Sequence, residues 1–262
     1  MNGLFRLTLR QMLGGMKIWL VAVFLSLPIL LLGAVLFARG FAFTADDANH
    51  IDPKAEEGVA AVFLYVLYPQ GLCILASLIY GATLLAGEIE DKTLVYLFTR
   101  AQPRWKILLG KYLATSLVLG CMTSASMLLC FALAGAPYGA SLLWALLATI
   151  FAACFAYTAL FALLGLAVPR RALTIGLIYA VLVEFILSLV PALVNEATAS
   201  YYLRSMAYHI ANVKGIPLDA LDMLGDASLT RAVTAVVLIP VVALVLCGIV
   251  LHRKEWPLTE GV

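Results

Sequence analysis

Long apolar stretches alternate with short polar segments along the chain. Six of these stretches reach or exceed the roughly 20 residues that an α-helix needs to cross the hydrocarbon of a bilayer; they comprise residues 18–38, 59–86, 107–134, 141–168, 172–193 and 229–251. Inside a bilayer the backbone must satisfy its own hydrogen bonds, and a helix does so within one segment. The pattern therefore predicts an all-α integral membrane protein with six transmembrane helices.

Composition agrees with this fold class and excludes a soluble domain. Of the 262 residues, 64% are hydrophobic and 12% are charged, whereas a soluble domain is nearer to half apolar and a quarter charged. The five cysteines all fall inside apolar stretches and lack the spacing of metal ligands. We therefore expect five small buried side chains, with no disulfide framework and no metal site.

The distribution of lysine and arginine predicts the orientation in the membrane. With both termini in the cytoplasm, twelve of the 17 basic residues fall on the cytoplasmic side and five fall outside. This asymmetry follows the positive-inside rule. The expected location is a bacterial inner (plasma) membrane, crossed several times, with both termini cytoplasmic.

Two short turns predict antiparallel neighbouring helices. The segment GAPYGA (135–140) joins the third and fourth apolar stretches, and PRR (169–171) joins the fourth and fifth, where Pro169 ends a helix. Small residues recur at four-residue spacing in the third and fourth stretches, which favours close helix packing in lipid. These residues are Ser116, Gly120, Ser124, Ala148, Ala152 and Ala156.

Residues 1–17 precede the first apolar stretch and have an amphipathic pattern. Arg6, Arg10 and Lys17 fall on one face of a helix, and the apolar side chains fall mostly elsewhere. This pattern favours a helix that lies in the plane of the membrane interface. The alternative is a simple continuation of the first transmembrane helix.

A charged segment interrupts the apolar pattern at residues 87–112, which read GEIEDKTLVYLFTRAQPRWKILLGKY. In a helix, Leu94, Leu97 and Phe98 share one face at i, i+3 and i+4. Glu88 and Glu90 then lie in the first turn, where the helix dipole favours acidic side chains. The pattern suits a short amphipathic helix on the cytoplasmic side that docks into a groove of a soluble partner. The alternative is a solvated loop whose basic side chains reach the headgroups.

This segment resembles the signature of type-two (ABC-2-type) ABC transporter permeases, in which G-E-x-E-x-G-T-L-x-x-L-L precedes x-P-x-x-R-x-x-x-L-L-G-K. The matching residues are Gly87, Glu88, Glu90, Thr93, Leu94, Leu97, Arg104, Leu108, Leu109, Gly110 and Lys111. Lys92 stands where glycine is usual, and Ala101 stands where proline is usual, with Pro103 two residues later. These two departures affect where the helix ends. The order of the six stretches also fits the family, so the resemblance extends over the whole chain.

The resemblance implies a permease subunit of an ABC exporter that works with a separate ATPase subunit and a second permease chain. In that family, residues 88–106 correspond to a coupling segment that docks on the ATPase. The implied docking residues are Glu88, Glu90, Thr93, Leu94, Leu97, Phe98 and Arg104. The chain has no G-x-x-x-x-G-K-[ST] motif, so we expect ATP and Mg on the partner and no enzymatic activity or cofactor in this chain.

Polar residues inside the apolar stretches are candidates for a translocation path. Glu184 lies near the middle of the fifth stretch, and Ser188 and Asn195 follow it at i+4 and i+11. A carboxylate at this depth costs at least about 2.5 kcal/mol, so it must be paired, protonated or facing water. The alternatives are a polar lining of the path and a hydrogen bond within the bundle. Tyr68 and Gln70, beside a helix break predicted at Pro69, are further path candidates, with packing between helices as the alternative.

Residues 195–228 precede the last apolar stretch and contain YYLRSMAYHIANV, which is apolar but too short to span. The resemblance implies short re-entrant helices here at the outer mouth, and an aromatic interfacial anchor is the other interpretation.

Two other functions compete with the permease. One is an ion-coupled secondary transporter that uses Glu184, and the other is an intramembrane enzyme, for which Glu184 lacks a clustered ionisable companion. The substrate is not predicted.

Overall fold

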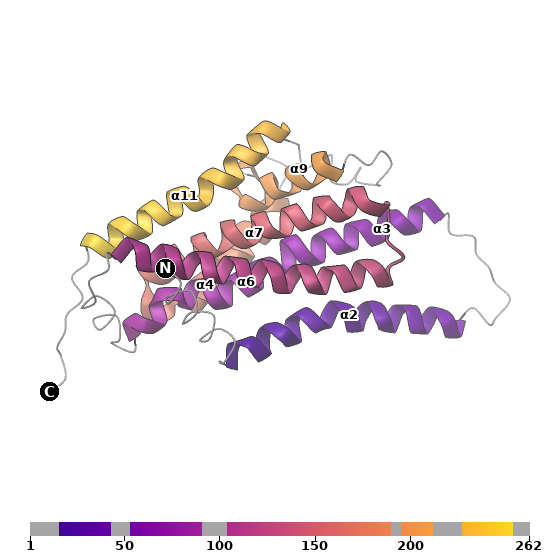
Figure 1. The fold of residues 1–262 in the computed structure, drawn as a ribbon, viewed down its shortest axis with the longest axis horizontal. Helices are drawn as coiled ribbons and strands as arrows, with labels where there is room; N and C mark the ends of the chain where they lie inside the picture. The colour runs from indigo at the N-terminus through magenta and orange to yellow at the C-terminus, as the bar shows by residue number, and fades with distance from the viewer. Residues whose placement is uncertain (1–15, 43–52, 91–103, 190–194, 212–226, 254–262) are drawn as a thin grey trace.

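The computed structural model describes residues 16–42, 53–90, 104–189, 195–211 and 227–253 (Figure 1). Every regular element among these residues is a helix, which confirms the predicted all-α class, whereas the count of six transmembrane helices stays a prediction. The N-terminal segment 1–15 and the middle of the coupling segment, residues 91–103, lie outside the described residues. The predictions of an interfacial helix and of a docking face at Thr93, Leu94, Leu97 and Phe98 therefore stay predictions.

Helix α7 (Gly139–Ala167) forms the centre of the bundle. It packs against α4 (Cys73–Glu90), α6 (Arg104–Leu133), α9 (Ala199–Ala211) and α11 (Leu229–Arg253). Its sequence is rich in alanine, and the buried side chains of Tyr157 and Phe161 fill the space between these neighbours. Helix α2 (Met16–Ala42) lies at the edge of the bundle against α6 (Figure 1). The hydrophobic core is therefore arranged around α7.

Four helical spans among the described residues are long and apolar enough to cross a membrane. They are Glu57–Gly87, Trp105–Leu133, Gly139–Ala167 and Leu229–Arg253. In α2 the described apolar part is the shorter Trp19–Ala34. Trp105 and Trp144, near the first residues of the antiparallel helices α6 and α7, are both exposed. Exposed tryptophans at opposite ends of a bundle are typical of membrane interfaces, so the chain is a multi-pass membrane protein.

The two predicted turns are confirmed. Helix α6 ends at Leu133 and α7 begins at Gly139, and the amide of Ala136 donates to the carbonyl of Phe131 at 3.0 Å in the turn between them. Gly135 and Gly139 adopt positive φ angles of 78° and 63° there, a conformation that costs glycine little. At the other end, α7 stops before Pro169, and a 3₁₀ turn, η2 (Pro169–Arg171), leads into α8 (Ala172–Tyr179).

The closest helix packing in the bundle is between α4 and α7, which the spacing of small residues did not predict. A Cβ atom added at Gly165 of α7 would overlap the carbonyl oxygen of Ala82 on α4, and one added at Gly81 would lie 3.0 Å from the carbonyl oxygen of Thr158. Backbones approach this closely only where side chains are missing. The predicted contact of α6 with α7 is present, and there Gly120 lies against the ring of Phe151.

Three local predictions are wrong. Pro69 does not break the second span, because α3 (Pro53–Tyr65), the π-helical η1 (Val66–Leu72) and α4 follow each other without interruption. Proline has no backbone N–H to donate, and the π-helical turn accommodates this missing hydrogen bond without ending the helix. Glu88 and Glu90 belong to the last turn of α4 and not to the first turn of a new helix, since nothing in AGEIE terminates a helix.

The third wrong prediction concerns the cysteines. Four of the five are buried free thiols, but Cys121 is exposed on α6. An apolar surface in contact with lipid tolerates such a small side chain as well as the core does. Apolar surroundings in the sequence of a membrane protein therefore do not distinguish the core from the lipid-facing surface.

Candidate functional site

The candidate site is centred on Glu184, whose side chain is fully buried. It belongs to a second π-helical segment, η3 (Ala180–Ile186), which follows α8 and precedes the 3₁₀ turn η4 (Leu187–Leu189). The neighbouring side chains of Leu182, Phe185 and Ile186 are exposed. Glu184 therefore faces the interior of the bundle, as does the buried Ala180 at the start of the same segment.

Five hydrogen-bond donors converge on the carboxylate of Glu184. Its Oε2 atom accepts from the Ser200 hydroxyl at 2.7 Å, the Ser200 amide at 2.9 Å and the Tyr157 hydroxyl at 3.2 Å. Its Oε1 atom accepts from the Tyr179 hydroxyl at 3.0 Å and the Ala199 amide at 3.3 Å. Both oxygens are thus surrounded by donors, which is the requirement for a buried carboxyl group.

Two of these donors are the first amides of helix α9. The first four amides of a helix have no partner within the helix, and its dipole favours negative charge at this end. Glu184 is 15 residues away from Ala199 in the sequence, yet it accepts from the first two amides of α9, while the local Thr198 hydroxyl accepts from the Tyr201 amide at 3.3 Å. The carboxylate therefore connects the fifth membrane segment to the start of α9.

The two tyrosines extend this connection to α7 and α8. Tyr157 of α7 and Tyr179 of α8 both lie against Phe161, with ring centroids 6.4 Å and 6.1 Å apart. The Tyr157 hydroxyl is also 3.0 Å from the Ser200 hydroxyl. Aromatic packing thus fixes the direction of both hydroxyl groups toward Glu184. The site joins four segments of the chain at one buried carboxylate.

The predicted stripe of Glu184, Ser188 and Asn195 along one α-helix is wrong, because the fifth segment changes from α to π to 3₁₀ geometry. Ser188 is buried and accepts from the Nε2 group of Gln70 at 3.4 Å, away from Glu184. Asn195 is also buried, but in a separate turn, η5 (Asn195–Ala197), where the Thr198 hydroxyl donates to its carbonyl at 2.8 Å. The three residues do not form one surface.

Tyr68 and Gln70 lie in the π-helical segment η1 of the second span and face different partners. The Tyr68 hydroxyl is buried and lies 2.8 Å from the Ser126 hydroxyl of α6, which donates to the carbonyl of Leu25 in α2 at 2.7 Å. Gln70 is only partly buried and contacts Ser188. Tyr68 therefore connects three helices, whereas Gln70 connects the π-helical segment η1 to the 3₁₀ turn η4.

Helix α9 packs inside the bundle, between α7 and α11. Its Arg204 is buried, with the guanidinium 5.7 Å from the centre of the Tyr201 ring. Further along α9, the Ser205 hydroxyl accepts from the Ala227 amide at 3.1 Å. Near the end of the helix, His209 Nε2 is 2.9 Å from the Ala227 carbonyl oxygen. These contacts attach α9 to the chain that enters α11. The sequence pattern did not predict a buried arginine in this segment.

The ends of the predicted coupling segment lie at one end of the bundle. Helix α4 ends at Glu90 and α6 begins at Arg104, close to the end at which α11 terminates (Figure 1). Just beyond, Trp105 and Lys106 are exposed, with the ammonium 5.5 Å from the indole ring. Lys111, which ends the match to the family signature, is buried. The segment that carries the predicted docking residues therefore connects two neighbouring membrane spans.

Tyr157, Tyr179 and Ser200 are the members of the site that the sequence analysis missed. Each is a common residue type, and no spacing relative to Glu184 marks it out. The usable signal was the cost of a carboxylate in the membrane, which requires donors nearby. That signal predicts that partners exist, but it does not say where in the sequence they are.

One family model matches the chain over residues 45–203, and its description is "ABC-2 family transporter protein". The match covers more than half of the sequence and includes both the charged segment and Glu184. No curated protein and no solved structure matches the chain.

Proposed function

The chain belongs to the ABC-2 family of transporter proteins, and on this premise we propose that it is the permease subunit of an ABC exporter. It forms the translocation path and is driven by ATP hydrolysis on a separate ATPase subunit. The observation that carries this proposal is the family match over residues 45–203, which includes the segment between α4 and α6. This subunit itself is a non-enzymatic membrane component.

The coupling segment, residues 88–106, supports a docking role through its composition and position. It holds acids and bases around the apolar LVYLFT run, and it connects two membrane spans at one end of the bundle. Such a short connection transmits a movement of its partner directly to two helices. ATP and Mg are bound by the partner, because the chain carries no phosphate-binding loop of its own.

We propose six membrane crossings with both termini and the coupling segment in the cytoplasm. Four spans are long and apolar enough by themselves. Helix α2 supplies the first crossing, and α8 with η3 and η4 supplies the fifth, in which the changes of helix type shorten each regular part. The predicted interfacial helix at residues 1–17 precedes the six-helix domain at residues 18–262, in a bacterial inner membrane.

Six crossings make half of a transporter of this family, so we propose that two permease chains assemble with two ATPase subunits. The outward face of the fifth segment supports this assembly. Leu173, Leu177, Val181 and Phe185 follow one another at four-residue spacing along this face, and all are exposed. A second permease chain, identical or closely related, would cover such a face and place the two fifth segments next to the path.

Within this arrangement, we place the polar lining of the path at Gln70 and Ser188 and assign Glu184 to the support of α9. Gln70 lies in the π-helical η1 and is partly exposed, and its amide donates to the buried Ser188 of the 3₁₀ turn η4, directly after the π-helical η3. π-Helical turns occur frequently at functional sites, and their altered hydrogen bonds make them suited to a change of helix geometry. Glu184, in contrast, is fully buried among five donors, which does not favour its use as the carrier of a coupled ion.

The proposal is tested by purifying the chain together with the ATPase subunit encoded beside it. We expect a complex that hydrolyses ATP, and we expect the permease alone to show no hydrolysis. The same complex in proteoliposomes should hydrolyse ATP at a rate that depends on the permease. Failure of the two chains to co-purify, together with transport driven by an ion gradient alone, would contradict the proposal.

A further inference from the structure

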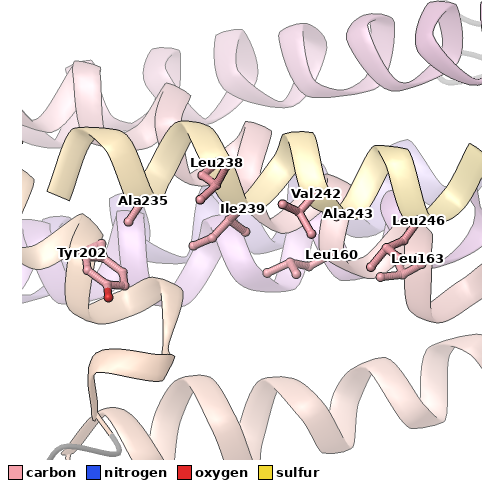
Figure 2. Close-up of a pocket in the computed structure, with 9 residues that line it drawn as sticks. All are labelled: Leu160, Leu163, Tyr202, Ala235, Leu238, Ile239, Val242, Ala243 and Leu246. Carbon is pink, nitrogen blue, oxygen red and sulfur yellow. The ribbon is translucent and has the colours of Figure 1, made fainter. Parts of the chain in front are cut away.

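An apolar groove runs along the surface of α11, the most exposed of the spans among the described residues. It has a volume of about 370 Å³. One wall is α11 from Ala235 to Leu246, and the other is formed by Leu160 and Leu163 of α7 with Tyr202 of α9 (Figure 2). Ala235 and Ala243 have small side chains, so they leave space between the larger residues beside them. The groove therefore lies within the membrane-spanning part of the molecule and is lined almost entirely by hydrocarbon.

The dimensions of the groove limit what can occupy it. From Ala235 to Leu246 it extends over eleven residues of α11, which is about 17 Å at the helical rise, or roughly half of the hydrocarbon thickness. A volume of about 370 Å³ over this length corresponds to a mean cross-section of about 22 Å². A helix of a second protein, about 10 Å across, could place only one row of its side chains in a groove of this width. The groove therefore fits a single extended hydrocarbon chain better than a helix of a second protein.

The end of the groove at Tyr202 has a different chemistry. The Tyr202 ring packs edge-on against Tyr201 at 5.2 Å and stands next to Ala235 (Figure 2). Among the described residues, none donates a hydrogen bond to the Tyr202 hydroxyl or accepts one from it. A hydroxyl group at the end of an apolar groove suits a molecule with a hydrocarbon chain and a polar group, because tyrosine pairs an apolar ring with a polar tip.

We propose that this α11 groove (Ala235–Leu246 with Leu160, Leu163 and Tyr202) binds one acyl chain of a membrane phospholipid, with the ester or headgroup at Tyr202. Tyr202 lies toward the first residues of α11, so the lipid belongs to the outer leaflet under the orientation proposed above. The bound chain fills the space between α7, α9 and α11 and stabilises the position of α9. The bilayer supplies this ligand at high concentration, and no transported substrate is involved.

The test measures phospholipid that stays bound through detergent purification. The protein is reconstituted with a phospholipid that carries a diazirine on its acyl chain, extracted, washed in detergent and irradiated. Native mass spectrometry counts the retained lipid, and peptide mapping locates the cross-link. We expect retained lipid in the unaltered protein, with cross-links to α11 between Ala235 and Leu246 or to Leu163 of α7.

Two substitutions fill the groove, and one control lies outside it. Ala235→Phe places a ring in the groove, and Leu238→Trp does so from a position that is 60% exposed, where no core packing is disturbed. Both should reduce the retained lipid several-fold. Val241→Phe adds the same bulk on the exposed face of α11 that does not line the groove, and it should retain lipid as the unaltered protein does.

Equal retention in all three variants would overturn the proposal. It would also be overturned if no lipid is retained and Leu238→Cys forms a disulfide between two copies, because a second chain would then cover the groove. Neither readout uses the ATPase subunit or a transported substrate. A negative result would therefore leave the proposed permease function untouched.

Discussion

Glu184 and Ser200 are joined through both the side chain and the backbone of the serine, with the hydroxyl at 2.7 Å and the amide at 2.9 Å from the same carboxylate oxygen. The serine opens α9, and the glutamate lies on the π-helical turn of the fifth segment. A carboxylate supplied from another segment thus accepts from the first two amides of α9, and the local Thr198 hydroxyl accepts from the Tyr201 amide at 3.3 Å. This pair attaches the start of α9 to the fifth segment.

Replacing Glu184 should therefore destabilise the protein even when the shape is kept. Glu184→Gln turns one acceptor oxygen into an NH₂ group that faces donors, and a buried donor without a partner costs about 1–3 kcal/mol. Glu184→Leu should cost more, because all five donors then lose their acceptor. The measurement is the thermal unfolding temperature of the detergent-purified protein. Ser124→Ala is the matched control, since the buried Ser124 hydroxyl has no hydrogen-bond partner among the described residues; an unchanged temperature in Glu184→Gln would refute the capping role.

The glycine contact between α4 and α7 gives a second prediction. Gly165→Ala places a methyl group against the carbonyl oxygen of Ala82, and overpacking of this kind costs about 1–3 kcal/mol. Gly248→Ala in α11 is the control, because a Cβ atom there meets nothing within 4 Å. We expect a lower unfolding temperature only for the first variant. Similar temperatures for the two would show that the helices separate easily.

The coupling segment is tested at its predicted apolar anchors. Leu97→Ala combined with Phe98→Ala should release the ATPase subunit or uncouple its hydrolysis, since truncating an anchor at an interface costs about 2 kcal/mol or more. Glu90→Gln should have a smaller effect, because exposed charge pairs contribute about 0–1 kcal/mol. The assay is a pull-down from detergent, with ATPase activity measured on the recovered complex. Normal recovery and normal coupled hydrolysis in the double variant would indicate a solvated loop.

The orientation is tested by cysteine labelling in a cysteine-free background. Asp47→Cys should react with an impermeant maleimide from outside, and Thr99→Cys should react only after the membrane is permeabilised. This result follows from the asymmetry of lysine and arginine. The opposite labelling pattern would place the coupling segment outside the cell and remove the docking argument with it.

The assignment of the path is tested at Gln70 in η1 and at Ser188 in η4. Gln70→Cys, at a partly exposed position, should react with a water-soluble thiol reagent, and Ser188→Cys, at a position that is buried in this structure, should become reactive when the ATPase partner binds ATP. Leu64→Cys is the control, because this fully buried side chain of α3 faces the core. If the two cysteines react no faster than Leu64→Cys in either state, the path does not pass between these segments.

Several features followed from local chemistry, and the sequence was enough to predict them. The turn at 135–140 has positive φ angles at Gly135 and Gly139, where they cost little, and also at Ala136 and Tyr138, and Pro169 ends α7 because it cannot continue a helix. The resemblance of residues 87–111 to the family signature agrees with the family match. Pro69 shows the limit of this reasoning. Pro169 ends a helix, whereas Pro69 lies within a π-helical turn and the helix continues past it.

By itself, the sequence determined the all-helical membrane class and the need for hydrogen-bond donors around Glu184, because both depend on the free energy of transferring side chains from water into the membrane. It also determined the family, because the signature is a contiguous motif. Only the tertiary structure decided which donors meet that need. Ser200, Tyr157 and Tyr179 come from three different helices, and their convergence depends on how those helices cross. The close contact at Gly165 and the groove along α11 have the same origin. In a chain where both the core and the lipid-facing surface are apolar, polarity cannot separate the two, and only packing does.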